Sequence, residues 1–182
     1  MQFAKESIFP KYLDVVKMLG VITSGFMGTV AADGALDLYD GQIRLMYADG
    51  SYEEFPVARY TDYIAEHVEP WTYLKFPYAK QKGPWALVDN SPSLYRVNSL
   101  ARINVCDYIP TPLAQAELEE FRRNFGRPAQ LTLLYHWARL IELLYNAEMA
   151  VKLLSDPEIV STDIRKKVEP RAARGVGCVE AP

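Results

Sequence analysis

Apolar and polar positions alternate in short runs between Phe26 and Phe55. The runs read FMGTVAADG, ALDLYDG, QIRLMYADG and SYEEF, and Asp-Gly pairs close the first three at or near positions 33–34, 40–41 and 49–50. Asp and Gly tolerate the positive φ angles that tight hairpin turns require. The pattern predicts an antiparallel meander of three or four strands, with one buried face and one face in water.

Helical spacing governs the start of the chain and its second half. Apolar residues recur at helical intervals from Phe9 to Leu19, which predicts a short amphipathic helix. Thr111 and Pro112 are typical of a helix start, and Gly126 is typical of a helix stop. The run from Ala129 to Leu154 is apolar on more than one side, so we expect a long helix in the centre of a helical layer.

The middle of the chain is less regular. Residues Tyr60–Val68 show a helical pattern, in which His67 is interpreted as a helix-end residue and not as a ligand. Four prolines, at positions 70, 77, 84 and 92, and many aromatic residues follow before Ser93, which predicts an ordered aromatic loop packed on a neighbour. The segment Tyr95–Asp107, YRVNSLARINVCD, is interpreted as a loop that forms a wall between the two halves.

These elements predict an α+β protein, with a β meander followed by a mainly helical half. Its 182 residues suit a single domain. Within it we expect a helix, the meander and a short helix in residues 1–70. The aromatic, proline-rich loop then occupies 71–110, and the helices with the GVGCVEAP tail occupy 111–182.

Composition and charge exclude several classes of protein. The net charge is −3 and Lys and Arg are scattered, so the chain has no basic stripe for nucleic acid. An apolar span of about 18 residues for a membrane and a signal-peptide h-region are also absent from the sequence. We therefore expect a cytoplasmic protein.

Catalytic motifs are missing from the sequence. It contains no P-loop, no dinucleotide fingerprint, no G-x-S-x-G and no H-E-x-x-H. The two cysteines, Cys106 and Cys178, are far apart and fit no metal-ligand spacing, so two free thiols are expected. We predict no catalytic residue and no metal ligand.

Polar residues in apolar surroundings are instead expected to be structural. On the long helix, Arg139 and Glu142 have the spacing of an ion pair, in a polar seam with His136. A buried structural pair is favoured there over a proton relay. Arg96 and Arg102 are likewise expected to be structural, as donors to backbone carbonyls and carboxylates, and the nearby Asp107 is a structural polar residue of the same segment.

Several blocks of the chain resemble one family. They are YLKFPYAK (73–80), YRVNSLARINVCD (95–107), TPLAQAELEEFR (111–122), LLYHWARLIELL (133–144) and GVGCVEAP (175–182). In this order they resemble an internal piece of the large subunit of nickel-iron hydrogenases, of the cytoplasmic, bidirectional, NAD-linked type. One departure is Asn98-Ser99, where relatives usually have Gly-Pro; the turn survives it because Asn tolerates positive φ.

The resemblance implies a site whose ligands lie outside the chain. The family holds nickel and iron through R-x-C-G-x-C and D-P-C-x-x-C motifs, and neither motif is present here. By resemblance, Pro182 and Ala181 would line the active site. The chain itself would bind no cofactor, whereas the full-length parent would carry a nickel-iron centre with CN and CO ligands.

The implied function is that of a hydrogenase fragment that is inactive alone, while its parent would oxidise and evolve H2. Its partners would be the iron-sulfur small subunit, with a diaphorase module reached through it; a homo-oligomer of the fragment is also open. The alternative is a stand-alone hydrogenase-like interaction or assembly module without catalysis. A thiol-based redox enzyme using Cys106 and Cys178 is a third possibility.

Overall fold

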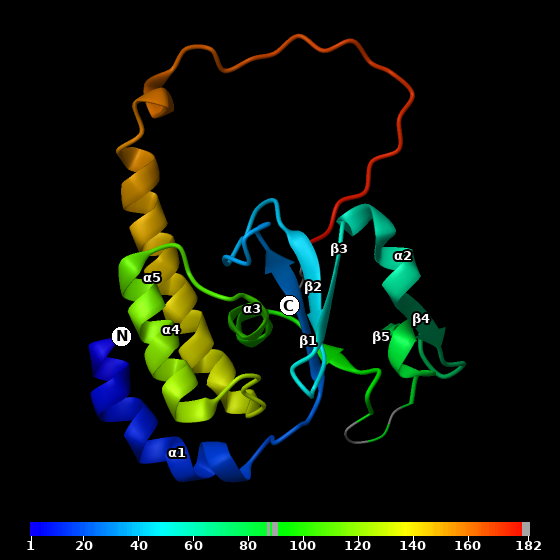
Figure 1. Cartoon of the computed structure of the whole chain (residues 1–182), viewed down its shortest axis with the longest axis vertical. Helices are drawn as coiled ribbons and strands as arrows, with labels where there is room; N and C mark the ends of the chain where they lie inside the picture. Colours follow the sequence, from blue (N-terminus) through cyan, green and yellow to red (C-terminus); the bar gives the residue numbers. More distant parts are fainter. Residues whose placement is uncertain (87, 89–90, 180–182) are drawn as a thin grey trace.

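The chain folds as an α+β protein, as its sequence pattern predicts. The computed structural model describes residues 1–86, 88 and 91–179 (Figure 1). A four-stranded sheet stands beside a group of helices on one side and a small two-stranded hairpin on the other.

The predicted meander forms three antiparallel strands, β1 (Gly25–Val30), β2 (Gln42–Met46) and β3 (Tyr52–Phe55). The short strand β6 (Tyr95–Arg96) adds to β1 in parallel, so that the order is β3-β2-β1-β6. Gly34 and Gly50 have φ angles of +85° and +86°, which confirms two of the three predicted Asp-Gly turns, those at 33–34 and 49–50. This conformation is one that glycine adopts without steric cost.

A further strand in ALDLYDG does not form. Only an isolated bridge joins Leu36 to Val30, and the segment then turns. The Asp37 carboxylate accepts the backbone N–H groups of Tyr39 and Asp40, at 2.7 and 2.9 Å. Such local side-chain bonds compete with the strand ladder, which explains why the alternating pattern misled the prediction here.

The predicted wall segment contains a buried helix, so its interpretation as a loop is wrong. Helix α3 (Ser99–Val105) packs on β1, and of its residues only Arg102 is not classed as buried. Asn98 precedes it with a φ of +75°, the positive angle expected of the Gly-Pro replacement, and its side chain accepts the N–H of Ser99 at 2.6 Å. A helix that is buried on nearly every side shows no single apolar stripe, and a seven-residue pattern carries little periodic signal.

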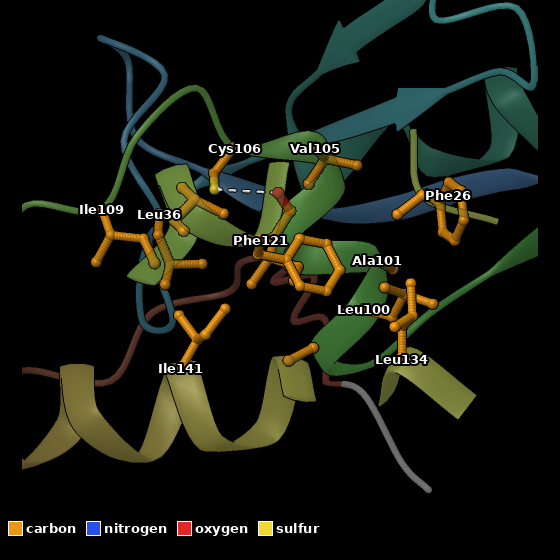
Figure 2. Packing of buried hydrophobic residues seen from close by; sticks show 14 of the residues in the cluster. Phe26, Leu36, Leu100, Ala101, Val105, Cys106, Ile109, Phe121, Leu134 and Ile141 are labelled. Carbon is orange, nitrogen blue, oxygen red and sulfur yellow. Dashed lines mark hydrogen bonds between the residues drawn. The ribbon is translucent and has the colours of Figure 1, made fainter. Parts of the chain in front are cut away.

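Two longer helices enclose α3. Helix α4 (Pro112–Phe125) starts and ends where the sequence predicts, with Gly126 at a φ of +74° after its last turn, and α5 (Tyr135–Leu154) follows. The N-terminal helix α1 (Phe9–Met18) continues a π-helical turn, Ala4–Ile8, and stacks Phe9 on Trp137 at 4.4 Å between ring centroids. Figure 2 shows the resulting core, in which Phe121 and Ile141 meet α3.

The region expected to be a helix and a loop is mostly a hairpin. Helix α2 (Tyr60–Tyr63) has only one turn, and β4 (Ile64–Val68) then pairs antiparallel with β5 (Lys75–Ala79). His67 therefore lies on a strand, where its ring stacks on Trp85 at 4.1 Å. Cross-strand and aromatic packing overrides the weak helical pattern, as is common for short segments.

The C-terminal segment runs apart from the rest of the chain. After a 3-10 turn at Pro157–Val160, residues 161–179 form neither helix nor strand. The segment arcs away from α5 and returns to the sheet (Figure 1). Among the described residues, no helix is long and apolar enough to cross a membrane.

Candidate functional site

The most polar part of the interior surrounds α3, where four arginines meet carboxylates and backbone carbonyls. Arg102 of α3 and Glu142 of α5 form a two-pronged ion pair: Nε lies 2.6 Å from Oε1, and Nη2 lies 2.7 Å from Oε2. Both side chains are largely buried, at 17% and 9% exposure. A bidentate pair of this kind fixes the direction of both side chains and so the relative position of the two helices.

The expected pairing of Glu142 with Arg139 is not what the structure shows. Glu142 faces α3, while the Arg139 guanidinium lies 5.7 Å from the ring centroid of Tyr135. His136 lines an apolar groove between α1 and α5. These residues therefore face three different surroundings, and the structure does not bring them together as a seam.

Arg96 ties three segments together. Its guanidinium donates to Ser24 Oγ at 2.8 Å, to the Ile22 carbonyl at 2.9 Å and to Gln130 Oε1 at 2.6 Å. Burial lowers the pKa of Arg96 from its usual value, but an arginine side chain stays protonated in proteins. The residue joins the segment before β1 to the one before α5.

Three arginines from outside α3 cap its C-terminal carbonyls. Arg122 donates to Ile103 O and Cys106 O at 2.9 and 2.7 Å. Further bonds run from Arg127 to Asn104 O (2.7 Å) and from Arg44 to Val105 O (2.6 Å). Cations favour this end of a helix, where carbonyls lack intrahelical partners.

Asp107 completes this group by balancing part of its charge. Its carboxylate lies 2.9 Å from Arg44 and 3.1 Å from Arg127. Partial burial works against ionisation, but the two guanidinium groups outweigh it and hold the pKa of Asp107 below its usual 3.8. The sequence named Asp107 but missed Arg44, Arg122 and Arg127, because their role depends on a helix that its pattern did not reveal.

Cys106 and Cys178 are both reduced, and their environments differ. Cys106 is fully buried, and burial raises its pKa to about 11, although Arg122 works in the opposite direction. Cys178 is exposed. A reactive thiolate needs an exposed, electropositive setting, so Cys106 is unsuited to thiol chemistry.

Cys178 and Arg102 also border an open hollow of about 350 Å³ above β1, with Gly28 and Thr29 among its other lining residues. Arg102 is already bonded to Glu142, and Cys178 is the hollow's only thiol among the described residues. In the described part of the chain, no group of three or more His, Cys, Asp or Glu residues is placed to hold a metal. Ala181 and Pro182, expected to line an active site, lie outside the described residues.

The fold of this chain, with its sheet and the helices around α3, is similar to part of a hydrogenase. No family model matches the chain. It is 48% identical over 178 residues to a vhu subunit of the F420-non-reducing hydrogenase of Methanococcus voltae, and 39% identical over 160 residues to the NAD-reducing hydrogenase HoxS subunit beta of Cupriavidus necator. It also superposes on a chain of the crystal structure of an NAD+-reducing NiFe hydrogenase in the H2-reduced state, with a TM-score of 0.79 and 35% identity over 92% of its length.

The matched region is a part of each relative. The alignments include 97% of this chain but 41% of the Methanococcus voltae protein, and 86% of this chain but 32% of HoxS subunit beta. Of the crystallised hydrogenase chain, 36% is covered.

The names of the relatives correct the assignment to a nickel-iron large subunit. A relative from Archaeoglobus profundus, 38% identical over 175 residues, is named as an iron-sulfur subunit of F420-non-reducing hydrogenase, and this contradicts the expected subunit type. The description of the crystal structure refers to the whole enzyme and leaves the type of the matching chain open. The similarity to NAD-reducing hydrogenase, an oxidoreductase, stands.

The cofactor expected for the full-length parent is corrected for the same reason. A nickel-iron centre with CN and CO ligands is contradicted by the iron-sulfur name, and the described residues offer no metal-binding group in its support. An iron-sulfur cluster is usually held by four thiolates. This chain has two cysteines, one of them buried beside α3, so its own residues do not fit such a cluster either.

Proposed function

We propose that this chain is a structural segment of a hydrogenase subunit, which takes part in the oxidation or evolution of H2 without a redox centre of its own. The observation that carries the proposal is the similarity of fold, a TM-score of 0.79 over 92% of the chain, together with 48% identity to a hydrogenase subunit. The arginine-capped α3 gives the segment a rigid centre, which suits a structural role.

Its partners, on this proposal, are other hydrogenase subunits. Because the chain has too few cysteines for a cluster, electrons from H2 would pass through redox centres outside these 182 residues. Another hydrogenase subunit that holds such centres, with a diaphorase module beyond it that reduces NAD+, would meet this need. The similarity to HoxS subunit beta favours NAD+ as the final acceptor. Assembly with such subunits would take place in the cytoplasm.

The division of the chain also remains a proposal. We infer one domain in residues 1–182, since the helices of 111–154 and the sheet of 25–55 share one hydrophobic core.

A segment exchange tests the proposed function. The matching 178 residues of the Methanococcus voltae vhu protein would be replaced by this chain, and the chimera expressed with its natural partner subunits. Co-purification of those subunits and H2-dependent reduction of a dye are the two measurements. We expect both to be retained.

The matched control carries Gly34→Pro in the exchanged segment, which breaks a turn and the packing on Asp107. This control should lose both assembly and activity. A folded chimera that fails to co-purify with the partner subunits would contradict the proposal.

A further inference from the structure

The β4–β5 hairpin is a two-stranded sheet whose two edges differ. On the outer edge of β5, Pro77 has no backbone N–H, and the N–H of Ala79 is already bonded to Ser93 O at 2.9 Å. Proline at an edge prevents further strand pairing. The hairpin can therefore grow only at β4.

The outward-facing groups of β4 follow from the register. Glu66 is opposite Pro77, so this pair cannot exchange two hydrogen bonds. In an antiparallel ladder bonded and non-bonded pairs alternate, which leaves the bonded positions to Ala65 and His67. The backbone N–H and C=O groups of Glu66 and Val68 consequently point away from β5.

The side chains along this edge suit association. Val68 and Trp71 are exposed by 62% and 68%, and Tyr60 of α2 by 44%. The charge of Glu66 is balanced within the hairpin by Lys75 at 2.9 Å. An edge strand flanked by exposed apolar and aromatic side chains is a template for another strand.

We propose that β4 pairs antiparallel with β4 of a second copy of this chain, giving a continuous four-stranded sheet, β5-β4-β4-β5. An antiparallel edge is self-complementary across a two-fold axis. A register with Glu66 opposite Glu66 would set like charges side by side, which is unfavourable. The favoured register places Glu66 opposite Val68 of the second copy, with His67 on the axis.

The same register accounts for the exposed aromatic residues of the hairpin. Beyond Val68 the chain turns back towards β5 through residues 69–72, and in this register that turn lies beside the α2 of the second copy, where Trp71 can meet the exposed Tyr60. Aromatic contacts of this kind are enriched in interfaces. This surface lies outside the α3 region, and the proposal is independent of the proposed hydrogenase function.

Replacement of the outward N–H tests the pairing. Val68→Pro removes two of the hydrogen bonds between the copies and leaves those between β4 and β5 in place, whereas Val68→Thr keeps the N–H. Sedimentation velocity up to the millimolar range should show a dimer for the wild type and for Val68→Thr. For Val68→Pro the dimer should be at least about tenfold weaker, from a loss of about 1 kcal/mol per bond.

Cross-linking tests the register. In a Cys178→Ser background, His67→Cys should form a disulfide between copies under mild oxidation, because non-bonded pairs bring Cα atoms to about 4.5 Å. Ala65→Cys is the control: it lies on the same face, but the register sets it about 13 Å from its counterpart. Circular dichroism confirms that each variant is folded.

Three results would overturn the proposal: a monomeric wild type at the highest concentration, a folded Val68→Pro variant that still dimerises with unchanged affinity, or equal cross-linking at positions 65 and 67. If the edge of β4 instead binds a strand of a different protein, the wild type should be monomeric at the highest concentration.

Discussion

Single residues near the C-terminal end of α3 connect the sheet to the helices. Gly34 and Asp107 meet here: a Cβ at Gly34 would overlap the Asp107 carboxylate, which Arg44 and Arg127 fix in place. The N–H of Asp107 also donates to the carbonyl of Gly34 at 2.7 Å. The turn after β1 is therefore shaped by a residue more than seventy positions further along the chain.

Two glycines of nearly equal conformation separate backbone strain from crowding. Gly50 has a φ of +86°, close to that of Gly34, but a Cβ there would meet nothing nearer than Pro128 Cδ at 4.0 Å. Gly50→Ala should cost about 1 kcal/mol of unfolding free energy, the price of a left-handed conformation. Gly34→Ala should cost about 3 kcal/mol, because overpacking is added to this strain. Urea denaturation measures the free energy of unfolding of both variants. Equal losses of this free energy would show that the Asp107 side chain moves aside at little cost.

Asp107 should make stability depend on pH on the acid side. Its pKa is lower in the folded protein than its usual 3.8, so its contribution is complete above that pH. It is lost as the pH falls further and the folded carboxylate takes up a proton. Asp107→Asn should therefore be less stable than the wild type at neutral pH, with the difference shrinking below about pH 4. Urea midpoints at a series of pH values measure this, and a constant difference down to about pH 2 would contradict it.

At the scale of elements, the sequence predicted those whose signals are local. The Asp-Gly turns and the limits of α4, from Pro112 to Phe125, depend on residues that are adjacent in the chain. Elements that depend on tertiary contacts were missed. Strand β5 forms because β4 pairs with it, and α3 forms because β1, α4 and α5 bury it. Arg102 and Glu142 were both named from the sequence, but their partnership required knowing that α3 is a helix.

The start of α4 is capped from another helix. Thr111 makes no side-chain bond to a backbone N–H of α4, and Glu148 of α5 accepts those of Leu113 and Ala114 at 3.0 and 2.9 Å. Although desolvation works against it, these bonds lower the pKa of Glu148. A carboxylate is favourable at this end of a helix.

Removal of this cap should weaken the contact between the two helices. Glu148→Ala should reduce the free energy of unfolding by about 1–2 kcal/mol, since two N–H groups lose their acceptor. Glu148→Gln, which keeps one acceptor oxygen, should lose less. Thermal unfolding followed by circular dichroism gives the ranking, and equal stability of the alanine variant and the wild type would show that water replaces the cap.

At the scale of the whole molecule, a compact body of sheet and helices carries a long extended segment after Val160 (Figure 1). Side chains along this segment are exposed, including the apolar Ile164 and Val168. Composition indicated a globular protein of one domain because it averages over the whole chain, and this average conceals that seven of the fourteen residues in 161–174 are charged.

The two thiols report separately on the compact body, which contains Cys106, and on the extended segment, which contains Cys178. A disulfide reagent such as Ellman's should modify Cys178 rapidly in the native protein, whereas Cys106 should react only on unfolding, since it is fully buried with a pKa of about 11. Titration should therefore count two thiols in the presence of denaturant and one in its absence. The Cys178→Ser variant is the control and should show none before denaturation. Rapid modification of Cys106 in that variant would contradict the packing around α3.

The arginine caps of α3 also bear on the order in which the chain folds. A helix of seven residues is too short to be stable alone, and the groups that satisfy its last carbonyls come from positions 44, 122 and 127. Strand β2 and helix α4 must therefore be in place before α3 gains its full stabilisation. Substitutions in α3 should chiefly accelerate unfolding and leave the folding rate nearly unchanged, the behaviour of a region that consolidates after the main barrier.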